Sequence, residues 1–301
     1  MGERDDRGTF NFGNYFAAFI DLLGTTQLIR SVPGIPLLVA LDEGFDAVEG
    51  AIAASKAAAV KLSSTLRQID GEIRGFLASA EKREADGAYS GTIKAAVPAA
   101  SGSSIQSQAF SDGLVVFTEV SDPAHQTPFA SVYTVLGALS TVFVNSLYRE
   151  WPVRIGVGLG WGAQPVEGMV YGACIESSYR MEQKAGYPRI VLHDDFVRYT
   201  RHHVDFAPRT DSVVIKINRK FAAACLDLVF RDEDGTAVLD YLKWIPFAHL
   251  AERTGFNPAR QAFAFITAER KRFHECGDTK LLERYDKLVA YFESRRSFWD
   301  M

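Results

Sequence analysis

Two aspartates stand where a protein could hold a metal ion. Asp21 follows the apolar run 15–20, and Asp112 lies beside Gly113 between two runs that alternate apolar and polar residues. An Asp-Gly pair between such runs is typical of a β-hairpin. If that hairpin lies beside the first strand, the two carboxylates come close together, and a divalent cation such as Mg²⁺ relieves their repulsion. Taken singly, each has a simpler interpretation, with Asp21 as a helix cap and Asp112 as a turn residue.

Phosphate chemistry is the second possibility that the residue types suggest. The residues after Asp21 are expected to begin a helix, and the free N–H groups at a helix start suit an anion such as a triphosphate. Glu176 and Arg180 are four residues apart on a predicted helix over 170–184, so they share a face. They are either a surface ion pair of little energetic weight or an arginine held over phosphate charge in a transition state.

These side chains need a sheet and helices to bring them together, and the pattern of the chain predicts both. Strands and helices mix in an order that favours an α+β fold with a ferredoxin-like sheet. We expect residues 1–235 to form one domain and residues 236–301 to form a helical extension packed on it. The other expected elements are a strand over 15–24, a helical insertion of about 36–85, a loop over 85–107, a hairpin over 107–120, helices over 129–148 and 170–184, and strands over 153–162, 188–193 and 212–217.

The helical insertion carries two apolar series that alternate in steps of three and four residues, as in a heptad seam. The series are Leu41, Val48, Leu62, Ile69 and Phe76 with Ser55 in the gap, and Phe45, Ile52, Ala59, Leu66 and Ile73. The helix either packs on its own domain or serves self-association. A perfect coiled coil is disfavoured by four glycines, at Gly44, Gly50, Gly71 and Gly75.

Composition and charge exclude several classes of protein. The 301 residues carry a formal net charge of −4 with basic and acidic residues interleaved, so we expect no nucleic-acid partner. Three widely spaced cysteines indicate a reducing cytoplasm and neither a disulfide scaffold nor a zinc site. Residues 129–148 carry no charge over the length of a membrane span, but their Ser, Thr and Asn residues favour a core helix.

Four blocks together resemble the class III nucleotidyl cyclases. They are FIDLLGTT at 19–26, SDGL at 111–114, RIGVGLG at 154–160 and VYGACIESSYRME at 170–182. The blocks follow the family's order and rough spacing over about residues 13–200. The resemblance implies the family's α+β sheet in residues 1–235. It also implies a lyase that converts a nucleoside triphosphate to the 3′,5′-cyclic monophosphate and pyrophosphate.

The resemblance also implies a set of site residues. Two divalent cations, Mg²⁺ or Mn²⁺, would be held by Asp21, Asp112 and the backbone carbonyl of Leu22. Arg180 would neutralise charge that develops in the reaction. The sites would form across a homodimer, with the metal aspartates from one chain and the arginine and base contacts from the other. The triphosphate would lie against Leu23, Gly24, Thr25 and Thr26.

Two positions depart from the family's pattern. Glu176 stands where the family has an asparagine that orients the ribose, and a glutamate near phosphate is repelled unless it is paired. The family's late triphosphate lysine has only a loose candidate, Lys216. Glu176 therefore leaves open a catalytically degenerate cyclase fold that serves dimerisation or nucleotide sensing. The presence of both Asp21 and Asp112 argues against that alternative.

The base contacts are the most informative departure. Gln108 stands four residues before Asp112, where adenylate and guanylate cyclases of this family have Lys or Glu, and a second base contact falls near Met169. A glutamine amide has a donor and an acceptor, so it could match uracil or, after a flip, cytosine. An adenylate or guanylate cyclase with unusual base contacts stays an alternative.

A looser resemblance points to the Pycsar pyrimidine cyclases, which are cytoplasmic enzymes of bacterial anti-phage defence. It rests on the first block, the Ser111-Asp112 hairpin and the long helical insertion. It favours UTP over CTP and implies that the cyclic nucleotide signals to a separate effector protein.

Overall fold

The protein is described by a computed structural model over residues 11–24, 46–85, 105–110, 113–121, 128–205, 212–244 and 254–300. Its centre is an eight-stranded sheet in the order β2-β3-β1-β4-β6-β8-β7, with β5 paired to β4. Paired strands are antiparallel except for β4 and β6. The strands are β1 (Asn11–Leu22), β2 (Gln106–Phe110), β3 (Gly113–Glu119), β4 (Val153–Val166), β5 (Met169–Tyr171), β6 (Ile190–Leu192), β7 (Val229–Arg231) and β8 (Ala237–Leu239).

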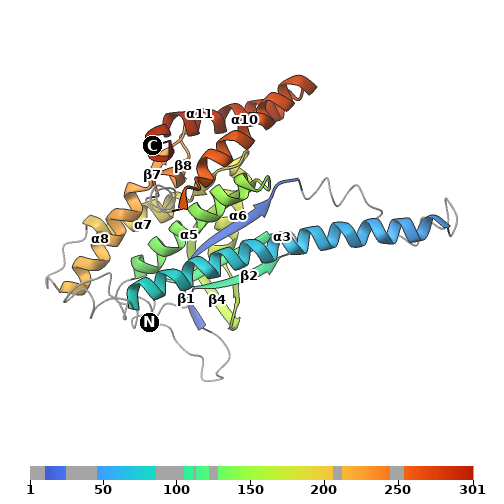
Figure 1. Cartoon of the computed structure of the whole chain (residues 1–301). Helices are drawn as coiled ribbons and strands as arrows, with labels where there is room; N and C mark the ends of the chain where they lie inside the picture. Colours follow the sequence, from blue (N-terminus) through green and yellow to red (C-terminus); the bar gives the residue numbers. More distant parts are fainter. Residues whose placement is uncertain are drawn as a thin grey trace.

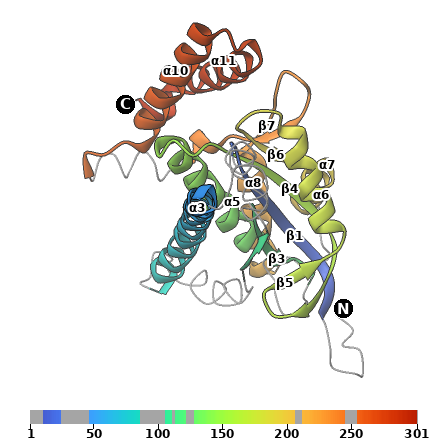
Figure 2. The same ribbon diagram turned by 90° about the vertical axis from the view of Figure 1, so that its right-hand side faces the viewer.

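Helices flank this sheet, so the expected α+β class is confirmed (Figures 1 and 2). They are α3 (Asp46–Ala85), α5 (Pro128–Tyr148), α6 (Ala173–Ala185), α7 (Asp194–Asp205), α8 (Val213–Asp227), the 3₁₀ turn η1 (Tyr241–Lys243), α10 (Pro258–Cys276), α11 (Thr279–Ser294) and α12 (Arg296–Trp299).

Strand β1 lies in the middle of the sheet, and apolar side chains cover both of its faces. Phe16 and Ile20 point into the main core, which includes Phe143 of α5. Tyr15 and Ala17 point to the other face and pack in a smaller cluster that includes Cys174 of α6. Figure 2 shows α5 and α6 on opposite sides of β1. Burial on both faces explains why this strand is a continuous apolar run in the sequence.

Helix α5 is the uncharged segment that matches a membrane span in length. By length and composition it is the one helix in the described part of the chain that could cross a membrane, and 72% of its most apolar window is buried inside the protein. Leu136, Leu139 and Phe143 belong to the main core. The prediction of a core helix is confirmed.

Helix α3 packs on the domain along only part of its length. Ile69 and Ile73 are buried in the main core, and Glu72 binds Arg149 at 2.9 Å. Nearer the start of the helix, Ile52 and Val60 are 52% and 57% exposed. Figure 1 shows this end of α3 extending past the sheet. Packing on the domain is therefore confirmed for the C-terminal half of the seam, whereas Leu41 and Phe45 lie outside the described residues.

Two segments have a different type of secondary structure from the one predicted. Residues 212–217 were expected to form a strand, but they begin helix α8, because Ser212 Oγ accepts the N–H of Ile215 at 3.2 Å and caps the helix. The helix predicted over 170–184 starts only at Ala173. The residues before it form β5, which follows a tight turn at Gly168, where φ is +82°.

The C-terminal segment is helical from Pro258 onward, and the predicted cap is confirmed. The Asn257 side chain accepts hydrogen bonds from the backbone N–H groups of Ala259 and Arg260. These helices share the main core with α5. The division after residue 235 stays a prediction, and β7 and β8 pair across that position.

Candidate active site

Asp21 lies at the end of the central strand, between the strands that carry other candidate residues. It pairs with Gly113 of β3 on one side and with Arg154 of β4 on the other. Strands β2 and β3 form the predicted hairpin, so Asp112 directly precedes in the sequence the residue that pairs with Asp21. Asp112 itself lies outside the described residues, as do Thr25 and Thr26.

The side chain of Arg154, a residue to which the sequence analysis gave no role, contacts Asp21. The Nη2 atom of Arg154 lies 2.8 Å from Asp21 Oδ2 and 2.7 Å from Glu182 Oε1. Arg154 Nε is buried and has no hydrogen-bond partner within the described part of the chain. Arg154 belongs to the third sequence block and Glu182 to the fourth, but only strand register and helix docking bring them to Asp21.

Glu182 is fully buried beside this arginine, and its acid strength is shifted. Burial raises the pKa of Glu182 to about 7, Arg154 opposes that rise, and the neighbouring Asp21 adds to it. Two carboxylates and one guanidinium therefore share this end of β1, with more negative than positive charge when both acids are ionised.

Glycines on β4 allow helix α6 to lie directly on the strand. A Cβ atom at Gly156 would come within 2.0 Å of Ser178 O and 2.1 Å of Glu182 N. At Gly158 it would come within 2.1 Å of Ser177 Oγ. The glycine-rich block is thus the reason that α6, with Glu176 and Arg180, packs so closely against the strand beside Asp21.

Glu176 and Arg180 form an ion pair on the outer surface of α6. Glu176 Oε1 lies 2.9 Å from Arg180 Nε, and their side chains are 60% and 59% exposed. None of the described contacts of Arg180 is with Asp21. The structure therefore brings Asp21, Arg154 and Glu182 together in one chain and leaves the Glu176–Arg180 pair facing away from them.

The two predicted base contacts lie next to each other. The Gln108 side chain accepts a hydrogen bond from the backbone N–H of Val170 at 3.0 Å. Val170 follows Met169, which is 36% exposed. Strands β2 and β5 are not paired by backbone hydrogen bonds, so the link through Gln108 could not be read from strand patterns.

The remaining phosphate candidates are only partly described. Leu23 N–H donates to the carbonyl oxygen of Pro152 at 3.0 Å, and Gly24 has a φ of +86°, so the chain turns here. Lys216 lies on α8, which packs against α5 and α7. Their contacts with a triphosphate stay predictions.

The donor chemistry at the end of β1 fits a hard divalent cation. Asp21 and the backbone carbonyl of Leu22 offer oxygen here, and the excess of carboxylate over guanidinium charge near Asp21, when Glu182 is ionised, is what a cation would relieve. Over the described ranges, no cluster of three or more His, Cys, Asp or Glu side chains could hold an ion. A site here would therefore depend on Asp112.

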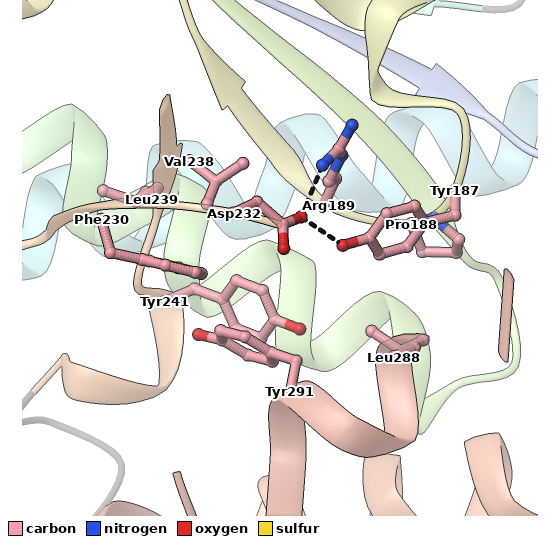
Figure 3. A pocket seen from close by; sticks show the side chains of 10 residues that line it. All are labelled: Tyr187, Pro188, Arg189, Phe230, Asp232, Val238, Leu239, Tyr241, Leu288 and Tyr291. Carbon is pink, nitrogen blue, oxygen red and sulfur yellow. Dashed lines mark hydrogen bonds and ion pairs between the residues drawn. The ribbon is translucent and has the colours of Figure 1, made fainter. Parts of the chain in front are cut away.

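A separate small pocket lies between the segment that leads into β6, the β7–β8 hairpin and α11 (Figure 3). Its polar side is a buried network in which Arg189 and Tyr187 both bind Asp232. The hydroxyl of Tyr241 is buried there without a hydrogen-bond partner in the described part of the chain. None of the predicted site residues lines this pocket.

Comparison with known proteins gives a distant likeness in fold. No family model matches the chain, and no curated protein matches it. Among solved structures, the guanylyl cyclase Cya2 is 14% identical with a TM-score of 0.34, covering 62% of this chain and 78% of that one. The catalytic core of a rhodopsin-guanylyl cyclase with converted specificity is 13% identical with a TM-score of 0.33, covering 62% and 79%. A bacterial light-regulated adenylyl cyclase is 10% identical with a TM-score of 0.34, covering 71% and 58%. A likeness at this level carries no argument about activity or substrate.

Proposed function

We propose that this protein is a nucleotidyl cyclase that converts a pyrimidine nucleoside triphosphate, UTP or CTP, to its 3′,5′-cyclic monophosphate and pyrophosphate. The observation that supports this most is the Arg154 guanidinium, which lies between Asp21 and Glu182 and whose buried Nε has no hydrogen-bond partner among the described residues. A buried donor without an acceptor is costly, and a phosphate oxygen would satisfy it. Groups suited to a cation and to a phosphate therefore lie side by side at the end of β1.

The proposed reaction forms one bond and breaks one. The ribose 3′-oxygen attacks the α-phosphorus and loses its proton to solvent, and the bond from the α-phosphorus to the bridging oxygen breaks to release pyrophosphate. When bound, Mg²⁺ or Mn²⁺ would activate the hydroxyl and neutralise phosphate charge. Asp21, Asp112 and the Leu22 carbonyl would hold it, while Arg180 would stabilise charge on the leaving oxygens.

We propose further that the active protein is a homodimer. In one chain Arg180 lies on an exposed face of α6 and does not contact Asp21, so a second copy would bring an arginine to the aspartates. An exposed aromatic surface on β1, β4 and β5 supports self-association, since large apolar patches mark interaction sites. Its members are Phe12, Trp161 and Tyr171, which are 49%, 51% and 50% exposed.

Mixing two inactive variants tests this shared site. Asp112→Ala and Arg180→Ala should each lose activity, and a mixture refolded or co-expressed together should recover part of it. Activity in a monomeric Trp161→Asp variant would contradict the homodimer. The same aromatic surface would then need another role.

A second candidate is a cyclase fold without catalysis that senses nucleotides. The ion pair between Glu176 and Arg180 favours it. Glu176 stands where the family that the sequence resembles has an asparagine, and its carboxylate already neutralises the charge of Arg180. The cyclase assignment requires this pair to open when substrate binds.

One assay separates these functions. The purified protein is incubated with ATP, GTP, CTP or UTP and with Mg²⁺ or Mn²⁺, and the products are identified by chromatography and mass. We expect cyclic UMP or cyclic CMP with pyrophosphate, which Asp112→Ala abolishes and Asp194→Ala, an exposed control on α7, does not. Cyclic AMP or cyclic GMP would overturn the pyrimidine assignment alone. Nucleotide binding without any product would favour the sensing module.

The proposed biological role is the production of a cytoplasmic second messenger in anti-phage defence. This part rests on the looser resemblance described above. It predicts that phage infection of cells carrying the protein raises the cyclic nucleotide, and that a separate effector protein binds the product.

A further inference from the structure

Two glutamines of the edge strand β2 form hydrogen bonds with the segment around β5, a strand that pairs only with β4. The Gln106 side chain accepts a hydrogen bond from Gly168 N at 2.8 Å, and the Gln108 side chain accepts one from Val170 N at 3.0 Å. Gly168 and Val170 flank Met169, so the two bonds hold the segment that carries this candidate base contact. Strands β2 and β5 otherwise lie at the two ends of the path β2-β3-β1-β4-β5.

The chemistry of the backbone fixes the orientation of the Gln108 amide. A peptide N–H can only donate, so the atom that faces Val170 must be the side-chain carbonyl oxygen Oε1. The amide nitrogen then points elsewhere with two N–H donors. A flip of the amide would set its NH₂ group against the Val170 N–H and break the bond.

Gln106 and Gln108 differ in how many hydrogen bonds their side-chain oxygens accept. Gln106 Oε1 accepts from Gln164 Nε2 as well as from Gly168, so both of its lone pairs are used. In the described part of the chain, Gln108 makes only the bond to Val170. Among the described residues, the Gln108 NH₂ group has no hydrogen-bond partner, so it is available to a ligand.

We infer that Gln108 presents only donors to the base, so that it selects a base by an acceptor on its Watson–Crick edge. This inference rests on the proposed function, in which Gln108 contacts the base. Uracil has a donor at N3 and an acceptor at O4, whereas cytosine has an acceptor at N3 and a donor amine at C4. The two pyrimidines are thus opposite in polarity at both positions, so a side chain that has only donors prefers uracil where it faces position 4 and cytosine where it faces position 3.

Reversing the polarity of this one side chain tests the inference. In Gln108→Glu, one carboxylate oxygen still accepts from Val170, while the other replaces the NH₂ donors by an acceptor. The ratio of kcat/KM for UTP to that for CTP should therefore move toward the pyrimidine that the wild type disfavours. We expect this ratio to shift by about ten- to hundredfold. That is the usual effect of placing two donors, or two acceptors, against each other in a buried site.

Gln106→Glu is the matched control, because it makes the same change two residues away on the same face of β2. It should leave the UTP-to-CTP ratio unchanged. An unchanged ratio in Gln108→Glu, or an equal shift in both variants, would overturn the inference even if the protein is a cyclase.

Hydrogen exchange at the Val170 amide provides a readout that needs no activity. Exchange measured by NMR should be slow in the wild type and in Gln108→Glu, and at least tenfold faster in Gln108→Met, which removes the acceptor. Equal exchange in all three would overturn the fixed orientation. A protected Val170 amide in a protein that neither binds nor converts any nucleotide would instead overturn the proposed function, and with it the role of Gln108 in base selection.

Discussion

Arg154 and Glu182 form a buried ion pair, 2.7 Å between Nη2 and Oε1, that joins strand β4 to helix α6. The same nitrogen binds Asp21. One guanidinium therefore links the helix that carries Arg180 to the candidate metal ligand on β1, in addition to the close packing of that helix on β4. This contact makes Arg154 important for stability as well as for the proposed chemistry.

Replacing Arg154 should destabilise the fold strongly. Arg154→Met leaves the buried Glu182 and the neighbouring Asp21 without their cation, and breaking a buried pair on one side costs about 3–5 kcal/mol. Urea unfolding measures this loss. Arg149→Met is the control, because its pair with Glu72 is partly exposed and should be worth less than about 1 kcal/mol. Similar losses in the two variants would contradict the structural weight given to Arg154.

Replacing glycine by alanine should have opposite effects on the stability of the fold at two positions, Gly156 and Gly75. Gly156→Ala places a Cβ atom within about 2 Å of backbone atoms of α6, so the helix must shift and the protein should lose at least ~2 kcal/mol. Gly75→Ala on α3 meets nothing within 4 Å and should stabilise the helix by up to about 1 kcal/mol. Thermal unfolding of both variants checks the sign. A neutral Gly156→Ala would show that α6 does not lie directly on β4.

Removing the Tyr241 hydroxyl should raise stability. The hydroxyl is buried next to the pocket in Figure 3 and lacks a partner among the described residues, so it loses its bonds to water when the protein folds. Tyr241→Phe should therefore stabilise the protein by about 1 kcal/mol, within the usual cost of an unsatisfied buried group. Tyr291→Phe is the contrast, because Tyr291 donates to Asp240 at 2.8 Å and its loss should destabilise. A destabilised Tyr241→Phe would indicate that a water or ligand in the pocket binds the hydroxyl.

Histidine burial should make the protein less stable in mild acid. Burial, with His202 nearby, lowers the pKa of His203 from its ordinary value of 6.5. The unfolded chain then binds a proton more readily than the folded one, so this stabilisation is present above pH 6.5 and is lost as the pH falls through the lowered pKa. His203→Phe should flatten the fall in unfolding free energy as the pH drops below about 6.5. An unchanged slope in His203→Phe would contradict this assignment.

Local patterns predicted the elements that carry a strong local signal. The Asp-Gly hairpin, the buried strand β1, the core helix α5 and the Asn257 cap are each set by neighbours in sequence. The run after Ser212 was misassigned, because its Val and Ile residues favour a strand whereas packing against α5 and α7 holds it as a helix.

The site contacts needed information that no single segment holds. The ion pair of Arg154 with Asp21 depends on the register of two strands that are far apart in the chain. The bond of Gln108 to Val170 depends on the curvature of the sheet, which brings two edges together. Periodicity indicates which face a residue occupies, but neither register nor curvature follows from it.

The position of α3 in the chain has a consequence for biosynthesis. During translation, synthesis of β1 ends at Leu22. The first strand that pairs with it, β3, begins only at Gly113, and α3 is made between the two. At roughly 5 to 20 residues per second, this apolar strand waits on the order of ten seconds before β3 is made, and longer for β4. A chaperone that binds short apolar segments during translation would therefore have time to bind β1, and the yield of folded protein should depend on such a chaperone more than the stability of the finished fold suggests.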